Sequence, residues 1–146
     1  MRFILETDYP TIIRNEVRNL LSTSYSDNKL IMAELMAIAQ IKNYIKGSYD
    51  VDAIFTPHIE TEPPTPDTRN AFIVMITIDC ALYHLYSNTA PDRIPEHRSQ
   101  RYQDALEWLK SVAKGETTAD LPTDEETGSV NGIKISSKYK KSTYRY

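Results

Sequence analysis

Apolar residues recur at helical spacing in the first third of the chain. Residues 10–21, which begin with a proline, predict a short amphipathic helix. Residues 28–46 predict a second helix, with Asp27 before it as a capping residue and Gly47 at its end. The expected core-facing positions of the second helix are Ile31, Leu35, Ile38, Ile41 and Ile45, with Ala33, Ala37 and Ala39 beside them.

The next apolar stretch is ambiguous in its first half. Residues 71–78 are almost all apolar and contain β-branched side chains that suit a buried strand as well as a helix. The apolar pattern continues to Tyr86, over about 18 residues, which is too long for an ordinary strand. We therefore expect a helix over residues 69–86, in the centre of the fold because it is apolar on most sides.

A fourth helix is expected over residues 95–114. Pro95 suits its first turn, and Gly115 is typical of a helix end. Trp108 adds a large apolar side chain, which we expect to be an anchor in the core or at an interface. The remaining apolar positions of this helix are Tyr102, Ala105, Leu106, Leu109 and Val112.

A long proline-rich loop is expected over residues 47–67, between the second and third helices. Its four prolines withdraw backbone donors and favour extended geometry, and residues 61–66 are expected to be exposed. The predicted fold is all-α, a compact four-helix bundle with this loop and an extended C-terminal arm. The apolar loop residues expected to pack on the helices or on a neighbouring subunit are Tyr49, Val51, Ile54 and Phe55.

Charge divides the chain into parts of opposite sign. Residues 129–146 contain five lysines and arginines and no acidic residue, whereas the other 128 residues carry twelve basic and twenty acidic groups. We therefore expect a helical domain over 1–115, an acidic linker over 116–128 and a basic, tyrosine-rich arm over 129–146. The charged and aromatic residues of the arm are Lys134, Lys138, Tyr139, Lys140, Lys141, Tyr144, Arg145 and Tyr146.

The arm has three interpretations. Its cations and tyrosines suit nucleic acid, through phosphate contacts and base stacking. They equally suit docking on another protein, where tyrosine and arginine are effective anchors. The third interpretation is a solubilising tail. Protein docking is favoured, because the acidic body would repel a polyanion and five cations hold it only modestly.

Residue types for catalysis or metal binding are scarce. Cys80 and His84 are four residues apart and share a helix face, so they are conceivable ligands of one metal, yet structural zinc usually needs four. A buried inert thiol and a hydrogen-bonded imidazole are the favoured alternative in this apolar setting. The chain also lacks a phosphate-binding glycine loop, a glycine-flanked serine and a two-histidine zinc helix. We expect no catalytic site, no metal site and no cofactor.

The single cysteine also bears on the compartment. One cysteine can form no internal disulfide, which agrees with a reducing environment. Glu6 and Asp8 interrupt the start of the chain before an apolar signal region can form, and we expect no stretch to approach the roughly 20 apolar residues that span a bilayer. We expect a protein of a cytosol-like compartment with no membrane partner.

The helices in this order resemble those of the Mu-like head-to-tail adaptor, or connector, proteins of tailed bacteriophages. The similar features are an acidic residue and a tyrosine in the third helix, an Arg-Tyr pair near the start of the fourth, and a glycine followed by a Leu-Pro exit. Residues 63–66 are richer in proline, and the arm richer in tyrosine and lysine, than the family pattern. The residues that carry the resemblance are Asp79, Tyr83, Arg101, Tyr102, Gly115, Leu121 and Pro122.

The resemblance implies a structural protein of the virion, located at the head-to-tail interface and assembled in the host cytoplasm. Such proteins form a homo-oligomeric ring, commonly a dodecamer, under the portal. The implied partners are the portal protein, a tail or further connector protein, other copies of the chain, and DNA that passes through the channel without sequence-specific binding. An acidic body suits such a channel, because like charge discourages DNA from sticking.

Two further expectations follow for the helices. If the third and fourth helices are antiparallel neighbours, Arg101 comes near Asp79 and an ion pair fixes their packing; the alternative is that Asp79 faces solvent. A different class of function also stays open, a cytosolic helical DNA-binding or regulatory module that uses the basic arm. The expected interface or core anchors are Tyr49, Phe55, Asp79, Arg101, Tyr102 and Trp108.

Overall fold

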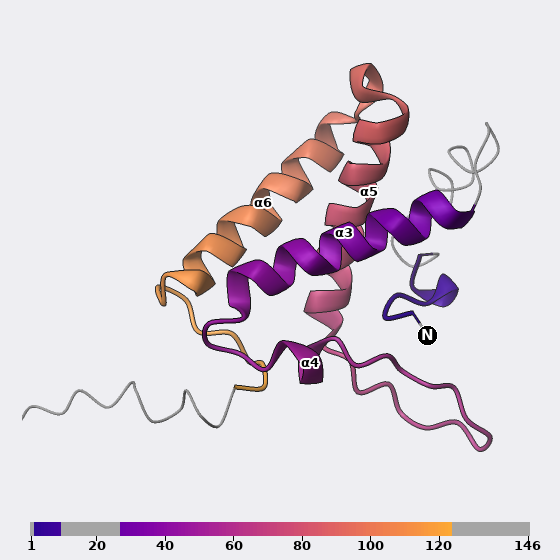
Figure 1. The fold of residues 1–146 in the computed structure, drawn as a ribbon, viewed down its shortest axis with the longest axis vertical. Helices are drawn as coiled ribbons and strands as arrows, with labels where there is room; N and C mark the ends of the chain where they lie inside the picture. Colours follow the sequence, from indigo (N-terminus) through magenta and orange to yellow (C-terminus); the bar gives the residue numbers. More distant parts are fainter. Residues whose placement is uncertain (1, 10–26, 124–146) are drawn as a thin grey trace, which may run out of the picture.

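The computed structural model describes residues 2–9 and 27–123, and within these ranges every regular element is a helix and no strand is present (Figure 1). The all-α prediction is therefore confirmed for the described residues. The predicted first helix at 10–21 and the arm at 129–146 lie outside them. The elements are η1 (Glu6–Asp8), α3 (Asp27–Ile45), α4 (Val51–Ile54), α5 (Ala71–Thr89), η2 (Pro91–Arg93) and α6 (Glu96–Ala113).

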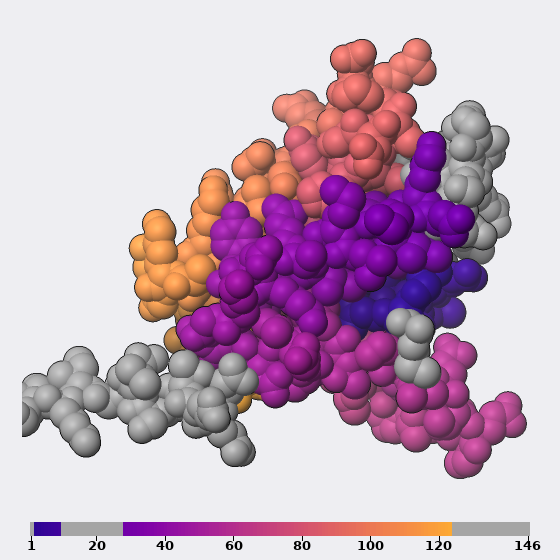
Figure 2. All heavy atoms as spheres, in the orientation of Figure 1, coloured from indigo at the N-terminus to yellow at the C-terminus, as the bar shows by residue number. Residues whose placement is uncertain are grey.

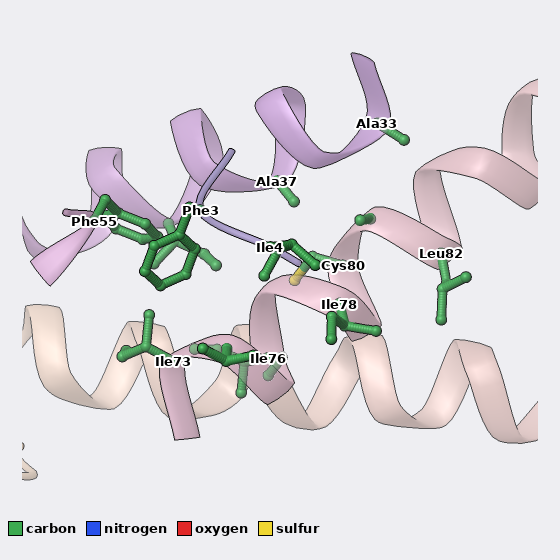
Figure 3. Packing of buried hydrophobic residues seen from close by; sticks show 14 of the residues in the cluster. Phe3, Ile4, Ala33, Ala37, Phe55, Ile73, Ile76, Ile78, Cys80 and Leu82 are labelled. Carbon is green, nitrogen blue, oxygen red and sulfur yellow. The ribbon is translucent and has the colours of Figure 1, made fainter. Parts of the chain in front are cut away.

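Three long helices form the body. α5 and α6 are joined by η2 and lie side by side, and α3 crosses them and packs mainly on α5 (Figure 1). The N-terminal segment contributes Phe3 and Ile4 to the same core, next to the apolar faces of α3 and α5 (Figure 3). One core cluster thus draws on all three helices and on the first residues of the chain.

α3 has the predicted length but buries a different face in its N-terminal half. Ala33 and Ala37 are buried, and their small side chains allow a close approach to α5. Leu35, expected in the core, is 54% exposed, and Ala39 is exposed as well. That part of the prediction is wrong, because choosing the larger side chains rotated the expected face by about one residue, or about 100°. The buried apolar positions are Leu30, Ala33, Ala37, Ile41 and Ile45.

α5 is the central helix, as predicted, and the strand alternative is excluded. Asn70 caps its start by accepting hydrogen bonds from the backbone N–H groups of Phe72 and Ile73 at 3.0 and 3.1 Å. Eleven of its nineteen residues are buried. By length and composition alone α5 is apolar enough to cross a membrane, so the expectation that no stretch reaches that limit was too strong. In this fold most of its surface packs against other parts of the protein.

α6 ends where the sequence predicted, and its C-terminus is closed by a glycine. Gly115 adopts a φ of +75°, a left-handed conformation that costs other residues energy. The N–H of Gly115 donates to the carbonyl of Val112 and the N–H of Glu116 to that of Ser111, both at 3.0 Å. These two bonds form a Schellman motif, which satisfies carbonyls that the helix end would leave unpaired.

The connection between α3 and α5 is more ordered than expected. Residues 51–54 form α4, which the prediction of an irregular loop missed. Asp50 caps it by accepting from the N–H groups of Asp52 and Ala53, a signal that was present in the sequence. The proline-rich remainder, residues 56–70, projects from the body (Figure 1).

The segment after α6 returns to the body beside α4. The N–H of Ala119 donates to the Tyr49 hydroxyl at 3.0 Å, and the N–H of Asp50 donates to the Pro122 carbonyl at 2.9 Å. Leu121 is partly buried against the core. Residues 116–123, the described part of the predicted acidic linker, are therefore attached to the helical domain.

Candidate functional site

A buried carboxylate joins α5 to α6. Asp79 is only 3% exposed, and its Oδ1 accepts hydrogen bonds from Arg101 Nε at 2.8 Å and from Arg98 Nη1 at 3.3 Å. The two arginines are three residues apart and so share a face of α6. The bond to Asp79 raises the pKa of Arg101. The predicted Asp79–Arg101 pair is present. Arg98 was missed, although its position one turn before Arg101 was a usable signal.

An aromatic and amide layer lies beside this ion pair and connects all three long helices. The rings of Tyr83 and Tyr102 stack with centroids 4.0 Å apart and planes 3° from parallel. Gln40 of α3 donates through Nε2 to the Tyr102 hydroxyl at 2.9 Å, and its Oε1 lies 2.8 Å from His84 Nε2. An amide oxygen only accepts, so His84 donates from Nε2. Burial lowers the pKa of His84, which favours this neutral imidazole.

Cys80 is fully buried in α5, in agreement with the inert-thiol interpretation. Burial raises the pKa of its thiol to about 12, and the neighbouring Asp79 carboxylate adds to the effect. At neutral pH the side chain is therefore a thiol rather than a reactive thiolate. Among residues 2–9 and 27–123, no group of three or more His, Cys, Asp or Glu side chains is arranged to hold a metal ion.

A second buried carboxylate holds the N-terminal segment against α3. Glu34 Oε1 accepts from Arg2 Nη2 at 2.6 Å, and Glu34 Oε2 accepts from Arg2 Nε at 3.1 Å. The hydroxyl of Tyr9 also donates to Glu34 Oε1. Burial and the adjacent carboxylate raise the pKa of Tyr9. None of these residues was singled out from the sequence.

Arg69 fixes the base of the proline-rich loop to the same N-terminal segment. Its guanidinium donates to Asp8 Oδ2 at 2.8 Å and to Asp67 Oδ2 at 2.6 Å, and also to the carbonyl of Phe3. The hydrogen bond from Arg69 lowers the pKa of Asp67 to about 2. The loop therefore projects from an anchored base (Figure 2). Its Ile59 is 54% exposed.

Two apolar surfaces remain exposed on the helices. On α3, the outer positions Met32, Leu35, Met36 and Ala39 are all exposed and follow one another at helical spacing; we call them the α3 stripe. α3 lies on the face of the molecule shown in Figure 2. Because the inward positions of α3 already pack on α5, this stripe points away from the core.

The other exposed surface is a groove along the seam of α5 and α6. Phe72, 42% exposed, packs edge-on against Trp108 with ring centroids 4.8 Å apart. Two hollows of about 150 and 260 Å³ meet at Phe72, which lines both. The exposed carboxylates of Asp104 and Asp120 lie at the first and the second hollow respectively. We call this surface the seam groove.

The expected anchors fall into two groups. Tyr49 and Phe55 are buried in the core, where Phe55 packs edge-on against Phe3 at 5.0 Å. The other four lie at the α5–α6 seam, where Asp79 is buried and the remaining three are half-buried. These four are Asp79, Arg101, Tyr102 and Trp108. The arm residues proposed for partner binding, from Lys134 to Tyr146, lie outside the described residues.

Residues 36–136 match the model of a protein family described as "Bacteriophage Mu, Gp36". The match covers more than half of the chain. The chain belongs to the bacteriophage Mu Gp36 family. No curated protein and no solved structure matches it. The resemblance to Mu-like phage proteins is thereby confirmed at the level of a phage family.

Some features of the site lie inside the range matched by the Gp36 family and others lie outside it. It includes α5 and α6 entirely, and with them the Asp79 cluster and all residues that line the seam groove. It begins at Met36, within α3, so Glu34 and the N-terminal segment that it holds lie outside the matched range. It also reaches residue 136, within the basic arm. The part shared with the Gp36 family is therefore the α5–α6 seam with its flanking segments.

Proposed function

We propose that this protein is a head-to-tail connector that forms a ring under the portal, extends the DNA channel and provides a docking surface for the tail. The observation that carries the proposal is the match to the bacteriophage Mu Gp36 family over residues 36–136. The specific connector role comes from the resemblance in the order and motifs of the helices, at Asp79, Tyr83, Arg101 and Tyr102.

The chemistry of the described residues is compatible with an assembly subunit. The buried charged groups Asp79, Arg98 and Glu34 are engaged in contacts that hold the fold together. Two apolar surfaces, the α3 stripe and the seam groove, are available to other polypeptides. The acidic body, with eight more acidic than basic groups outside the arm, suits a wall past which DNA slides.

The basic arm supplies a second, separate contact in this proposal. Residues 129–146 carry five cations and three tyrosines and reach to the portal or to the adjacent subunit. Ordering such a segment costs conformational entropy, which contacts formed on assembly offset. The arm is therefore expected to contribute to attachment rather than to the fold of the helical body.

The test is electron microscopy of the purified full chain, alone and mixed with the portal protein of the same phage. A ring that attaches to the portal is the expected result. A chain that stays monomeric and does not bind the portal would refute the connector role. Deletion of residues 129–146 should preserve the helical circular dichroism signal and weaken attachment, whereas unchanged attachment would remove the role of the arm.

A control variant tests whether attachment depends on the charge of the arm or on its length. Replacing Lys134, Lys138, Lys140, Lys141 and Arg145 with glutamine keeps the arm at full length and removes its charge. If attachment is electrostatic, this variant should behave like the deletion. Retention on duplex DNA that weakens steeply with salt would instead favour the DNA-binding alternative, and five cations limit the slope of log K against log salt to about −4.5.

A further inference from the structure

The α3 stripe and the seam groove are two different surfaces of one rigid body. The two hollows of the groove are lined by Asn70, α5, α6 and residues 118–121, and by no residue of α3. The stripe consists of the α3 positions that face away from α5. A single copy therefore cannot bring the two together, and a contact between them requires a second molecule.

The α3 stripe is a ridge and the seam groove is a hollow surface, so their shapes are complementary. The stripe is a helical ridge with two methionines and a leucine, and methionine side chains adapt readily to a partner surface. The groove has an aromatic floor at Phe72 and Trp108 with a hollow on each side of Phe72. Packing a helix ridge into a groove between side chains is the usual way in which helices associate.

Their charges are complementary as well. Between Lys29 and Lys46, the exposed positions of α3 carry no charge, and the partly exposed Lys42 is paired with Asp52. Lys29 lies one turn before the stripe, and Lys46 directly follows α3. The charged groups that line the groove are Asp79, Arg101, Asp104 and Asp120. Arg101 is bound to Asp79, so the two exposed aspartates give the groove a net negative charge.

We propose that the α3 stripe of one copy docks in the seam groove of the next copy, and that this contact repeats around the ring. The inference rests on the proposed connector function and adds the faces through which its subunits meet. Such a contact is heterologous, because each copy uses two different surfaces, and heterologous contacts close into rings when the rotation between neighbours allows it. A contact of stripe with stripe would instead be isologous and would stop at a dimer.

Two variants block the two surfaces separately. Leu35→Glu places a carboxylate on the stripe, opposite an acidic groove, and Phe72→Glu places one on the floor of the groove. Each alone should raise the dissociation constant for self-assembly at least about tenfold, because a charge would be buried without a partner. Ile59→Glu is the matched control, since Ile59 is 54% exposed, as is Leu35, but lies on the proline-rich loop. It should leave self-assembly unchanged.

Mixing the two blocked variants gives the decisive measurement. Each variant keeps one intact surface, so an equal mixture should form a 1:1 pair and no ring, as measured by native mass spectrometry and analytical ultracentrifugation. Homodimers formed by Phe72→Glu alone would indicate stripe-to-stripe contact and overturn the inference. Rings of normal stability from Leu35→Glu would overturn it too.

Folding of the variants is checked by circular dichroism and thermal unfolding. If Phe72→Glu unfolds, Asp104→Lys tests the groove through its charge instead, and if Leu35→Glu unfolds, Met36→Glu replaces it on the stripe. Failure of this inference is distinct from failure of the connector function. Wild-type rings that attach to the portal and are insensitive to all four substitutions would overturn the docking faces alone. A wild-type chain that forms no ring, alone or on the portal, would overturn both.

Discussion

Asp79 and Glu34 are carboxylates that are buried to the same extent but join different parts of the molecule. Each is 3% exposed and each is bound by arginine. Asp79 joins two long helices that are connected by a short link, and both of its arginines come from α6. Glu34 instead holds the first residues of the chain, through Arg2 and Tyr9, against the middle of α3.

The Asp79 contact supports the helical body, whereas the Glu34 contact holds the N-terminal segment on it. Arg98 is buried with Asp79, so loss of the carboxylate would remove a counter-charge from a cation in the interior. Arg2 has a side chain that is 30% exposed, so it can turn toward water if Glu34 is changed. We expect the first cluster to control global stability and the second to control local opening of the N-terminal segment.

The largest expected effect is that of Asp79→Ala. Breaking a buried ion pair by removing one partner typically costs about 3–5 kcal/mol, and we expect the free energy of unfolding to fall by that amount. Urea unfolding followed by circular dichroism at 222 nm measures it. Gln103→Ala, at an exposed position on α6, is the control and should change stability by less than about 0.5 kcal/mol. Equal stability of the two variants would show that Asp79 does not fix the seam.

Glu34→Gln should have a smaller and more local effect. The amide keeps the volume of the side chain but weakens the bonds from Arg2 and Tyr9, at a cost of about 1–3 kcal/mol. Phe3 and Ile4 belong to the core cluster that contains Cys80 (Figure 3), so release of the N-terminal segment opens a route to the thiol.

Thiol labelling of Cys80 detects this opening. We expect labelling in native buffer to be about tenfold faster in Glu34→Gln than in the wild type, which corresponds to about 1.4 kcal/mol of local stability. Asn43→Ala, at an exposed position of the same helix outside the α3 stripe, is the control and should label at the wild-type rate. A labelling rate that tracks global unfolding in every variant would contradict the distinction between the two clusters.

The same comparison explains what could be predicted from the sequence. The Asp79–Arg101 pair followed from two helices with a short connection, because such helices are antiparallel neighbours and their facing residues can be paired. Glu34 could not be assigned in this way, since Arg2 lies 32 residues before it and no periodic pattern relates an irregular segment to a helix face. The position of a long-range contact depends on packing, which the one-dimensional pattern does not contain.

The positions of the helices along the chain could be predicted from the sequence, whereas the face that a helix buries was predicted less well. The presence of α3, α5 and α6 and the limits of α3 and α6 followed from apolar periodicity and from residues typical of helix ends such as Gly115, all of which are local. α5 was expected over 69–86 and instead runs from Ala71 to Thr89. The inward face of α3 was misassigned at Leu35, because alanines rather than the larger residues meet α5. The seam groove could not be predicted from the sequence either, because Phe72 and Asp120 come together only when the chain returns to the body after α6.

The smallest expected effect concerns pH and the base of the proline-rich loop. The hydrogen bond from Arg69 holds the pKa of Asp67 at about 2, below its value of 3.8 in an unfolded chain. A depressed folded-state pKa contributes stability that is fully present above pH 3.8 and is lost as pH falls toward 2. Because the Asp67 side chain is 44% exposed, solvent screening keeps the gain within about 1 kcal/mol.

Asp67→Asn should therefore show a shallower loss of thermal stability between pH 4 and 2 than the wild type, with nearly equal melting temperatures at pH 2. NMR titration of the Asp67 carboxyl gives the direct value, and a midpoint near 3.8 would show that Arg69 does not hold the loop in solution.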